Sequence, residues 1–386
     1  MKQQVQLNYA LQILETYSPP APFHVHLKQF FRKHKQFGSR DRRLYSSLCY
    51  HYFRTGHSLD HLPAREALVY AHFLVSSQAD PFLDFWLREF SQLQPDDVQL
   101  PLAEKSALLE KHVDFNLEHI FPYTDELMEE IDAAAFIRSL LVQPWVWIRI
   151  RKEEKKVREE IVEKGWEPMV DEGQMMAFPQ DLPLTQLKSY GQGWFDIQDR
   201  SSQMTAKMFN PKPGEFWWDC CAGSGGKSLL IWDMQPDIHL YATDIRENIL
   251  SNYKTRMMKA GVKPEKVLEA DLTKDEEIAL PKFDGIILDA PCTGSGTWAR
   301  NSERLRYFEL NEIEQYAKLQ QKLLERVQQF LNPGKPIIYI TCSVFKKENS
   351  EVIGAAGPSL TEESRKAFPG YDKRSDSLFA SRLSTP

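Results

Sequence analysis

The sequence predicts an α/β fold in which an all-α domain and a small α/β connector precede a doubly wound, Rossmann-like parallel sheet. Three observations predict it. Apolar residues recur every three or four positions from Val5 to about Leu141, which is the period of helices. Strand and helix patterns then alternate along the C-terminal half. A glycine-rich turn, Cys221–Lys227, joins one such strand to the next helix, an arrangement typical of ligand-binding parallel sheets.

The helical domain is expected to span residues 1–141, because breakers such as Pro19, Gly38 and Pro63 separate its apolar segments. Its helices are predicted at Val5–Tyr17, Phe23–Phe31, Arg42–Phe53, Ala64–Val75, Phe82–Phe90, Ala107–Ile120 and Glu126–Leu141.

The connector is expected over residues 142–195. Trp147–Arg151 alternates like a strand, Glu153–Lys164 is a charged helix, and Met175–Phe178 is a second short strand.

The sheet domain is expected over residues 196–386. Its strands are predicted at Phe216–Asp219, His239–Asp244, Val267–Asp271, Gly285–Asp289 and Ile337–Cys342. Its helices are predicted near Ser201–Phe209, Ser228–Met234, Glu247–Ala260, Asn311–Phe330 and Glu348–Ile353.

A polar residue stands at the carboxyl end of each of the five predicted strands, the edge where parallel sheets bind ligands. A single Asp after a strand is more often a helix cap or a turn former. The shared position of all five therefore indicates a site: Asp219, Asp244, Asp271, Asp289 and Cys342.

The glycine-rich turn reads as a nucleotide-type cofactor site, because glycines let backbone N–H groups approach a ligand at a helix N-terminus. It is not a phosphate-binding P-loop, since Cys221 replaces the first required glycine, nor a dinucleotide fingerprint, since Ser228 replaces the third. A flexible turn without a ligand is the alternative. The position of Asp244 argues against this alternative, because a carboxylate at the end of the second strand can accept hydrogen bonds from ribose hydroxyls.

The composition is that of a soluble, cytoplasmic protein: 386 residues, 42% hydrophobic and 26% charged, with no apolar run long enough to cross a membrane. Five cysteines are odd in number and lack the paired spacing of a zinc site, so we expect reduced thiols and no metal. They are Cys49, Cys220, Cys221, Cys292 and Cys342.

The formal net charge of −6 argues against general affinity for nucleic acids, but Lys28–Arg43 is strongly basic and includes Arg40, Arg42 and Arg43. Such a run is usually a solvated helix face, and aromatics at helical spacing such as Phe30 usually belong to a core. The functional alternative is an RNA-binding surface.

Two cysteine loops follow the fourth and fifth strands, Asp289-Ala-Pro-Cys292 and Thr341-Cys-Ser343. Neighbouring strands would let Cys292 and Cys342 face one substrate. A nucleophilic thiol needs an electropositive surrounding or a base. Candidate cations are Arg300, Arg304, Arg306, Lys346 and Lys347; the alternative is two ordinary buried cysteines.

These motifs resemble the Sun/Nop family of RNA cytosine-5 methyltransferases. The resemblance is carried by Gln198–Gln203, Cys221–Lys227, Asp289–Cys292, Thr341–Ser343 and Glu348-Asn349. Gly38–Arg43 and the basic helices resemble the NusB-like N-terminal domain of the bacterial ribosomal-RNA branch. Asp376–Leu383 resembles the closing strand of the family's methyltransferase sheet.

The chain departs from the family in three places. It has Gly223-Ser224 where Ala-Pro is usual, it lacks a glycine after Asp376, and it matches poorly over Gly354–Tyr371.

The resemblance implies a class I methyltransferase domain that uses S-adenosylmethionine and acts on RNA, with 16S ribosomal RNA as the expected substrate and a monomer as the expected state. It makes Cys342 the nucleophile, Cys292 the group that helps release the product, and Asp289 the group beside N3 of cytosine. Arg40, Arg42, Arg43 and Arg300 are the expected RNA-binding residues. The expected cofactor-binding residues are Cys221, Ala222, Gly223, Ser224, Gly225, Gly226, Lys227, Asp244, Asp271 and Asp289.

Two other functions remain open from the residues alone. One is methyl transfer to a protein or small molecule on the same fold, which needs no nucleophilic thiol. The other is a catalytically silent RNA-binding or assembly factor that keeps the fold.

Overall fold

A computed structural model describes residues 2–90 and 92–385 and shows two compact units. The helical unit consists of residues up to Asp125, Asp132–Gln143 and Trp298–Glu309. The sheet unit consists of Glu126–Ile131, Pro144–Thr297 and the residues from Leu310 onward. The division into three domains expected from the sequence stays a proposal, and residues 144–195 lie in the sheet unit.

The sheet unit contains a seven-stranded sheet of order β10-β11-β9-β8-β5-β6-β7. The pairs β5–β6, β5–β8, β6–β7 and β8–β9 are parallel, whereas β11 is antiparallel to both β9 and β10. The prediction of a purely parallel sheet is therefore wrong at one edge, where the sheet is mixed. The strands are β5 Phe216–Asp219, β6 His239–Asp244, β7 Lys266–Glu269, β8 Gly285–Asp289, β9 Pro336–Thr341, β10 Thr361–Phe368 and β11 Leu378–Ser384.

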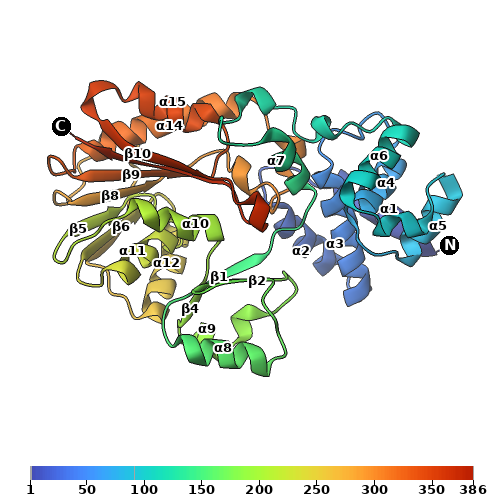
Figure 1. Cartoon of the computed structure of the whole chain (residues 1–386), viewed down its shortest axis with the longest axis horizontal. Coiled ribbons are helices and arrows are strands. Elements are labelled where there is room, and N and C mark those ends of the chain that lie inside the picture. The colour runs from blue at the N-terminus through green and yellow to red at the C-terminus, as the bar shows by residue number, and fades with distance from the viewer. Residues whose placement is uncertain (1, 91, 386) are drawn as a thin grey trace. The chain divides into compact units, whose positions relative to one another are not determined.

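Helices cover both faces of this sheet, with α11 and α12 on one side and α14 and α15 on the other (Figure 1). Their bounds are α10 Arg200–Met204, α11 Gly226–Met234, α12 Glu247–Ala260, α13 Arg304–Tyr307, α14 Asn311–Gln328 and α15 Ser350–Ala355, and α13 lies in the helical unit. The doubly wound α/β class predicted from the sequence is confirmed.

The sheet is buried on both faces, which explains why its central strands are nearly continuous apolar runs. Every residue of β9 is buried, and Trp217 and Trp218 of β5 are 1% and 0% exposed. The indole Nε1 of Trp218 donates to Thr243 Oγ1 over 3.1 Å, so its polar atom is satisfied inside the core.

Strand β10 is the part of the sheet that the sequence did not predict. Half of its residues 361–368 are charged and most are exposed, which is typical of an edge strand with one unpaired side. The expected closing strand Asp376–Leu383 is confirmed as β11, within two residues at its start.

The second sheet has the order β2-β3-β1-β4 and is antiparallel throughout. Its elements are β1 Val146–Ile150, α8 Glu154–Glu163, β2 Val170–Glu172, β3 Met175–Phe178, α9 Lys188–Gly191 and β4 Phe195–Ile197. Strands β2 and β4 were not predicted, because three residues are too few to show a period. Asp233 of α11 accepts hydrogen bonds from Arg149 over 2.6 Å and from Arg151 over 2.7 Å, which ties this sheet to the larger one.

The helical unit is all-α, as predicted. It contains α1 Lys2–Glu15, α2 Phe23–Lys33, α3 Ser39–Arg54, α4 Ala64–Val75, α5 Pro81–Phe90, α6 Leu102–Val113 and α7 Ala133–Leu140. Phe30, Phe37 and Tyr45 of the basic run are buried, so these aromatics belong to the core and not to a surface.

Two predicted helices are wrong in extent. The segment Ala107–Ile120 breaks at Asp114, whose φ of 53° lies in the left-handed region, and a short 3-10 turn follows at Leu117–Ile120. The segment Glu126–Leu141 is helical only from Ala133, because Asp132 Oδ1 accepts from the backbone N–H of Ala135 and caps the helix there.

Among the residues that the structure describes, no helix is long and apolar enough to span a membrane.

Gly285 provides a test of the packing of the large sheet. A Cβ at this position would lie 2.5 Å from ring atoms of Trp217, its partner in the neighbouring strand. Gly285→Ala should lower the free energy of unfolding by about 1–3 kcal/mol, the usual cost of overpacking a core, when measured by denaturant titration. Gly191→Ala, where nothing lies within 4 Å, is the control and should leave stability unchanged. Equal stability of the two variants would contradict this packing.

Candidate active site

The glycine-rich loop that follows β5 has two glycines in left-handed conformations that other residues rarely adopt. Gly223 has φ 53° and Gly225 has φ 88°. A Cβ at Gly225 would lie 2.6 Å from Met257 Cε, so both conformation and space require glycine there. Gly226 has no positive φ and is the first residue of α11, which corrects the expectation that all three glycines use this freedom.

Asp244, the last residue of β6, fixes the glycine-rich loop from the side of the sheet. Its Oδ2 accepts from the backbone N–H of Gly223 over 2.9 Å, and its carboxylate also accepts three hydrogen bonds from Arg246. Burial raises the pKa of this carboxyl, but the hydrogen bonds from Arg246 and Gly223 outweigh burial and leave the pKa lowered. Asp244 is therefore an ionised acceptor at the rim of the sheet.

A cavity of about 460 Å³ lies along this rim. Three of the five residues predicted at strand ends line it, Asp244, Asp271 and Asp289, with apolar side chains of α14 opposite, whereas Asp219 and Cys342 are not among the lining residues. The lining includes Cys221, Asp244, Asp271, Asp289, Cys292, Ile245, Leu272, Tyr316, Leu319 and Leu323.

Asp289, the last residue of β8, is paired with Lys227. Lys227 Nζ donates to Asp289 Oδ2 over 3.0 Å and to Ser202 Oγ over 2.8 Å. The Lys227 side chain is 7% exposed and that of Asp289 is 34% exposed, so the carboxylate faces the cavity with the ammonium behind it.

The two cysteines of the strand-end loops are in direct contact. Cys292 Sγ lies 3.3 Å from Cys342 Sγ, and both residues are partly accessible free thiols. This contact follows from the parallel pairing of β8 with β9, which brings the ends of the two strands side by side. The juxtaposition expected from the strand order is present.

The surroundings of Cys292 raise the pKa of its thiol. The hydrogen bond with Cys342, burial and the nearby Glu348 carboxylate all raise the pKa of Cys292. A thiol with a raised pKa keeps its proton and is a poor nucleophile. Cys292 is therefore the member of the pair that is suited to exchange a proton.

A buried carboxylate, Glu348, holds both cysteine loops. It accepts from the Thr293 backbone N–H over 2.9 Å and from Thr293 Oγ1 over 2.6 Å on one loop. On the other loop it accepts from Ser343 Oγ over 2.5 Å, and Gln320 of α14 donates to it over 3.1 Å. Burial raises the pKa of Glu348, although these hydrogen bonds oppose the shift.

Asn349 fastens the second loop to the end of β9. Its Oδ1 accepts from Thr341 Oγ1 over 2.5 Å and its Nδ2 donates to the Ser343 carbonyl over 2.9 Å. Since the flanking residues Thr341 and Ser343 are both fixed, Cys342 between them has a defined position.

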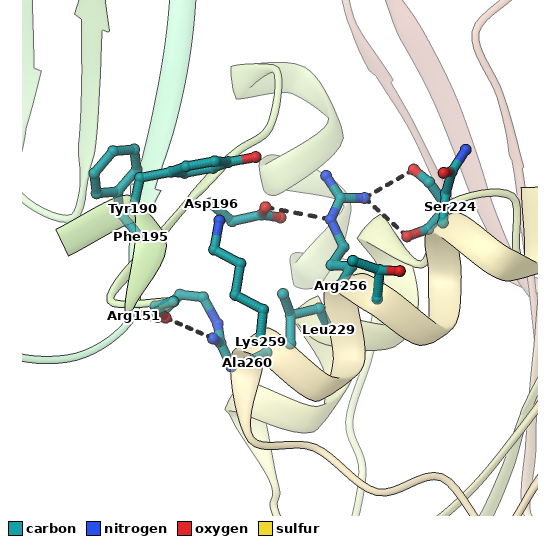
Figure 2. Close-up of a pocket in the computed structure, with 12 residues that line it drawn as sticks. Arg151, Tyr190, Phe195, Asp196, Ser224, Leu229, Arg256, Lys259 and Ala260 are labelled. Atoms are coloured by element: carbon teal, nitrogen blue, oxygen red, sulfur yellow. Dashed lines mark hydrogen bonds and ion pairs between the residues drawn. The ribbon is translucent and has the colours of Figure 1, made fainter. Parts of the chain in front are cut away.

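Of the expected cofactor residues, Cys221, Asp244, Asp271 and Asp289 line the cavity at the sheet edge, and Ser224 lines a different one. It lines a second cavity, where Arg256 of α12 donates to its carbonyl over 3.0 Å and to its Oγ over 2.9 Å (Figure 2). Arg256 also pairs with Asp196 of β4 over 3.3 Å. The loop is thus held from the outside by a residue that the sequence analysis missed.

The expected RNA-binding arginines lie in the helical unit. Arg40, Arg42 and Arg43 are exposed on α3, and Arg42 Nε donates to the Phe37 carbonyl over 3.0 Å. Arg40 and Arg43 line a cavity of about 550 Å³. Arg300 is half-buried in the segment Trp298–Glu309, so the structure groups it with the helices and not with the cysteine loops.

Two of the cations proposed near the thiols have other partners. Arg306 donates to Asp60 Oδ1 over 2.6 Å within the helical unit, and Lys347 pairs with Glu314 over 2.7 Å. Residues 2–90 and 92–385 contain no group of His, Cys, Asp and Glu side chains arranged to hold a metal ion.

Residues 206–372 match the family model described as 16S rRNA methyltransferase RsmB/F. These residues include the glycine-rich loop, Asp289 and both cysteine loops. This part of the chain is therefore similar to the methyltransferase domain of the RsmB/F family. The NusB-like resemblance concerns residues outside the match and stays a prediction.

The chain is also similar to curated ribosomal RNA methyltransferases. The chain is 30% identical over 232 residues to the ribosomal RNA small subunit methyltransferase B of an Enterobacter species, which covers 57% of this chain and 53% of the relative. The chain therefore spans about half of the length of the first curated relatives that it matches.

Solved structures share the fold. The crystal structure of the protein PH0851 covers 97% of this chain and 97% of its own, with a TM-score of 0.70 and 21% identity. That of NSun6 from Pyrococcus horikoshii with SFG covers 70% of this chain and 96% of its own, with a TM-score of 0.59 and 17% identity.

Glu348 gives a test of how the cysteine loops are held. Glu348→Ala should lower the free energy of unfolding by roughly 2–4 kcal/mol, because Thr293 and Gln320 would keep buried donors without an acceptor. Glu348→Gln is the matched control. Its carbonyl can accept from the Thr293 and Gln320 N–H groups and its amide can donate to the two hydroxyls, so most of the stability should remain. Denaturant unfolding measures both, and a Gln variant as unstable as the Ala variant would contradict this role.

Proposed function

We propose that this protein transfers a methyl group from S-adenosylmethionine to C5 of a cytosine in 16S ribosomal RNA, through a covalent bond between Cys342 and C6 of the base. The observation that carries the proposal is the pair of thiols 3.3 Å apart, next to Asp289 and the cavity at the sheet edge. The match of residues 206–372 to the RsmB/F model and the names of the curated relatives support it.

The cavity fits S-adenosylmethionine in size and chemistry. Apolar side chains such as Leu272 and Leu319 suit an adenine ring, and the carboxylates of Asp244 and Asp271 suit hydroxyl and amino donors. The structure of NSun6 with SFG, an analogue of S-adenosylmethionine, supports the assignment.

The Asp244 carboxylate already accepts four hydrogen bonds, three of them from Arg246. A ribose would therefore displace the Arg246 side chain, which is 59% exposed and free to swing into solvent.

Cysteine chemistry is needed because C5 of cytosine is too weak a nucleophile to take a methyl group unaided. The Cys342 thiolate adds to C6, the C5–C6 double bond is lost, and C5 becomes nucleophilic like the carbon of an enamine. S-adenosylmethionine supplies the electrophilic methyl group when it is bound.

Asp289 stabilises this adduct at N3 of the ring. Addition at C6 places electron density on N3, where a proton shared with the Asp289 carboxyl balances it. Lys227, 3.0 Å from Asp289 Oδ2, fixes the orientation of that carboxyl.

Cys292 completes the cycle by removing the proton from C5, after which the C6–S bond breaks and Cys342 leaves as a thiolate. The hydrogen bond with Cys342 is the first cause of the raised pKa of Cys292. That hydrogen bond is lost once the Cys342 sulfur is bonded to carbon. Adduct formation therefore removes one cause of the raised pKa of Cys292 and increases the fraction of thiolate that can accept the C5 proton.

The exposed arginines of α3 make the helical unit the proposed RNA-binding domain, and Arg300 a further RNA contact. We propose that the protein acts as a monomer in the cytoplasm, where ribosomal RNA is assembled. We also retain the division into a helical domain 1–141, a connector 142–195 and a methyltransferase domain 196–386, because the connector has its own small sheet and apolar core.

Separate substitution of the two thiols tests the chemistry. Cys342→Ala should abolish methylation and any adduct, because no activated C5 forms without addition at C6. Cys292→Ala should instead trap the methylated base, and a protein–RNA complex should accumulate as a shifted band on a denaturing gel. Trapping by Cys342→Ala alone would assign the nucleophile to Cys292. Methylation by the double variant would exclude covalent catalysis and favour transfer to another kind of substrate.

Removing the exposed charges of α3 tests RNA binding. Replacing Arg40, Arg42 and Arg43 with Ala should weaken RNA binding and reduce the slope of log affinity against log salt by about 2, since each phosphate contact on a single strand contributes about 0.7. Cofactor affinity should not change.

The control for this experiment removes three exposed cations elsewhere in the helical unit: Arg88, Lys111 and Arg138. Both triple variants carry the same net charge, so a general electrostatic effect would appear in both. An unchanged salt slope in the α3 variant, or an equal change in the control, would contradict the assignment of α3.

A further inference from the structure

A second cavity of about 320 Å³ lies beside the small sheet and shares no lining residue with the cavity at the cysteine loops. Its walls come from α12, from α9 with β4, and from the outer side of the glycine-rich loop. Figure 2 shows the Lys259 side chain extending from α12 toward Tyr190 and Asp196, with Arg256 beside it.

The charges around this cavity do not balance. Arg149 and Arg151 share the single carboxylate of Asp233, and Arg256 pairs with Asp196. Lys259 forms no ion pair with a carboxylate of the described residues; its ammonium lies 2.8 Å from the centre of the Tyr190 ring. Arg151, Arg256 and Lys259 line the cavity together with one carboxylate, Asp196, and Lys259 is the lining cation that has no hydrogen-bonding acceptor in the described part of the chain.

The titration of Lys259 agrees with this excess of positive charge. Burial lowers its pKa to about 8, Asp196 of β4 opposes the shift, and Arg256 of α12 and Arg151 after β1 add to it. An anion in the cavity would relieve the repulsion between these cations and favour the charged amine.

The walls indicate which anion. The exposed amide of Asn252 and hydroxyl of Thr255 supply neutral donors along α12, and Tyr190 with Phe195 supplies an aromatic wall. Cations with hydroxyl and amide donors recognise phosphate, and aromatic rings beside them accept a base or a ribose. The volume suits one nucleotide and exceeds that of a bare phosphate ion.

We propose that this cavity binds a phosphate group of the substrate RNA strand, with Lys259 as its principal contact, as a site separate from the cysteine cleft. The proposal rests on the proposed RNA methyltransferase function and adds a second point of attachment for the strand. Because Arg256 contacts both this cavity and Ser224 of the cofactor loop, the strand is anchored on the outer side of the loop whose inner side faces the chemistry.

The test compares Lys259→Gln with Lys254→Gln, an exposed lysine of the same helix outside the cavity. Binding of unmodified 16S ribosomal RNA should weaken about three- to tenfold in Lys259→Gln, with a salt slope smaller by about 0.7, the loss of one phosphate contact on a single strand. Lys254→Gln should bind RNA as the wild type does, and cofactor affinity should be unchanged in both.

A pH series adds a readout that loss of packing would not give. Wild-type RNA affinity should fall between pH 7 and pH 9 as Lys259 loses its proton, whereas Lys259→Arg should bind equally well at both pH values. A Lys259→Arg variant as weak as Lys259→Gln at pH 7, or a pH dependence identical to that of the wild type, would overturn the role of the charge.

Calorimetry with adenosine monophosphate distinguishes the source of the phosphate. If the wild type binds the nucleotide, Lys259→Gln does not, and RNA affinity is the same in both, the site takes a free nucleotide and the strand proposal is wrong. If Lys259→Gln matches the wild type in all measurements, the site does not bind phosphate. In both cases methylation of RNA by the wild type shows that the proposed function itself stands.

Discussion

The chemistry of this protein depends on the parallel pairing of β8 with β9. In that register Asp289 is opposite Ile340, so the two strands end together and their loops meet. A shift of one residue would turn every side chain of β9 to the other face of the sheet, and Cys342 would leave Cys292. The buried apolar residues of β9, from Ile337 to Ile340, prevent such a shift, because both faces are packed. The position of Cys342, the proposed nucleophile, is therefore determined by core packing.

Strand pairing brings the loops together, but the Glu348 carboxylate fixes them. A buried carboxylate costs free energy unless its oxygens are fully hydrogen-bonded. Here donors from both cysteine loops and from Gln320 satisfy it, and Tyr339 donates to the Glu348 carbonyl over 2.6 Å. The same arrangement raises the pKa of Cys292 through its negative charge. Glu348 thus acts on the geometry of both cysteine loops and on the protonation of Cys292, without lining the cavity.

The sequence predicted the centre of the sheet unit better than its edges. Strands β5, β6 and β8 were predicted to the residue, because buried parallel strands are apolar runs that end at Asp219, Asp244 and Asp289. The edge strand β10 was missed, because a charged and solvated strand has no apolar run to detect. Arg256 could not be recognised either: its partners Ser224 and Asp196 are distant in sequence, and nothing local to α12 marks it. The extra segment 298–309 of the helical unit was missed for the same reason.

The contacts on the cofactor loop explain how this chain uses Gly223-Ser224 without a rigid proline. The resemblance to the Sun/Nop family implied a more flexible loop at these residues. Asp244 holds the Gly223 N–H from inside the sheet, and Arg256 holds the Ser224 carbonyl and hydroxyl from outside. Two consecutive residues restrained from opposite sides lose most of the freedom that glycine introduces. Arg256 is in turn held by Asp196 of the small sheet, so the loop conformation depends on the connector. The proposed phosphate site lies between α12 and the connector, so a bound strand would contact the same arginine that restrains the cofactor loop.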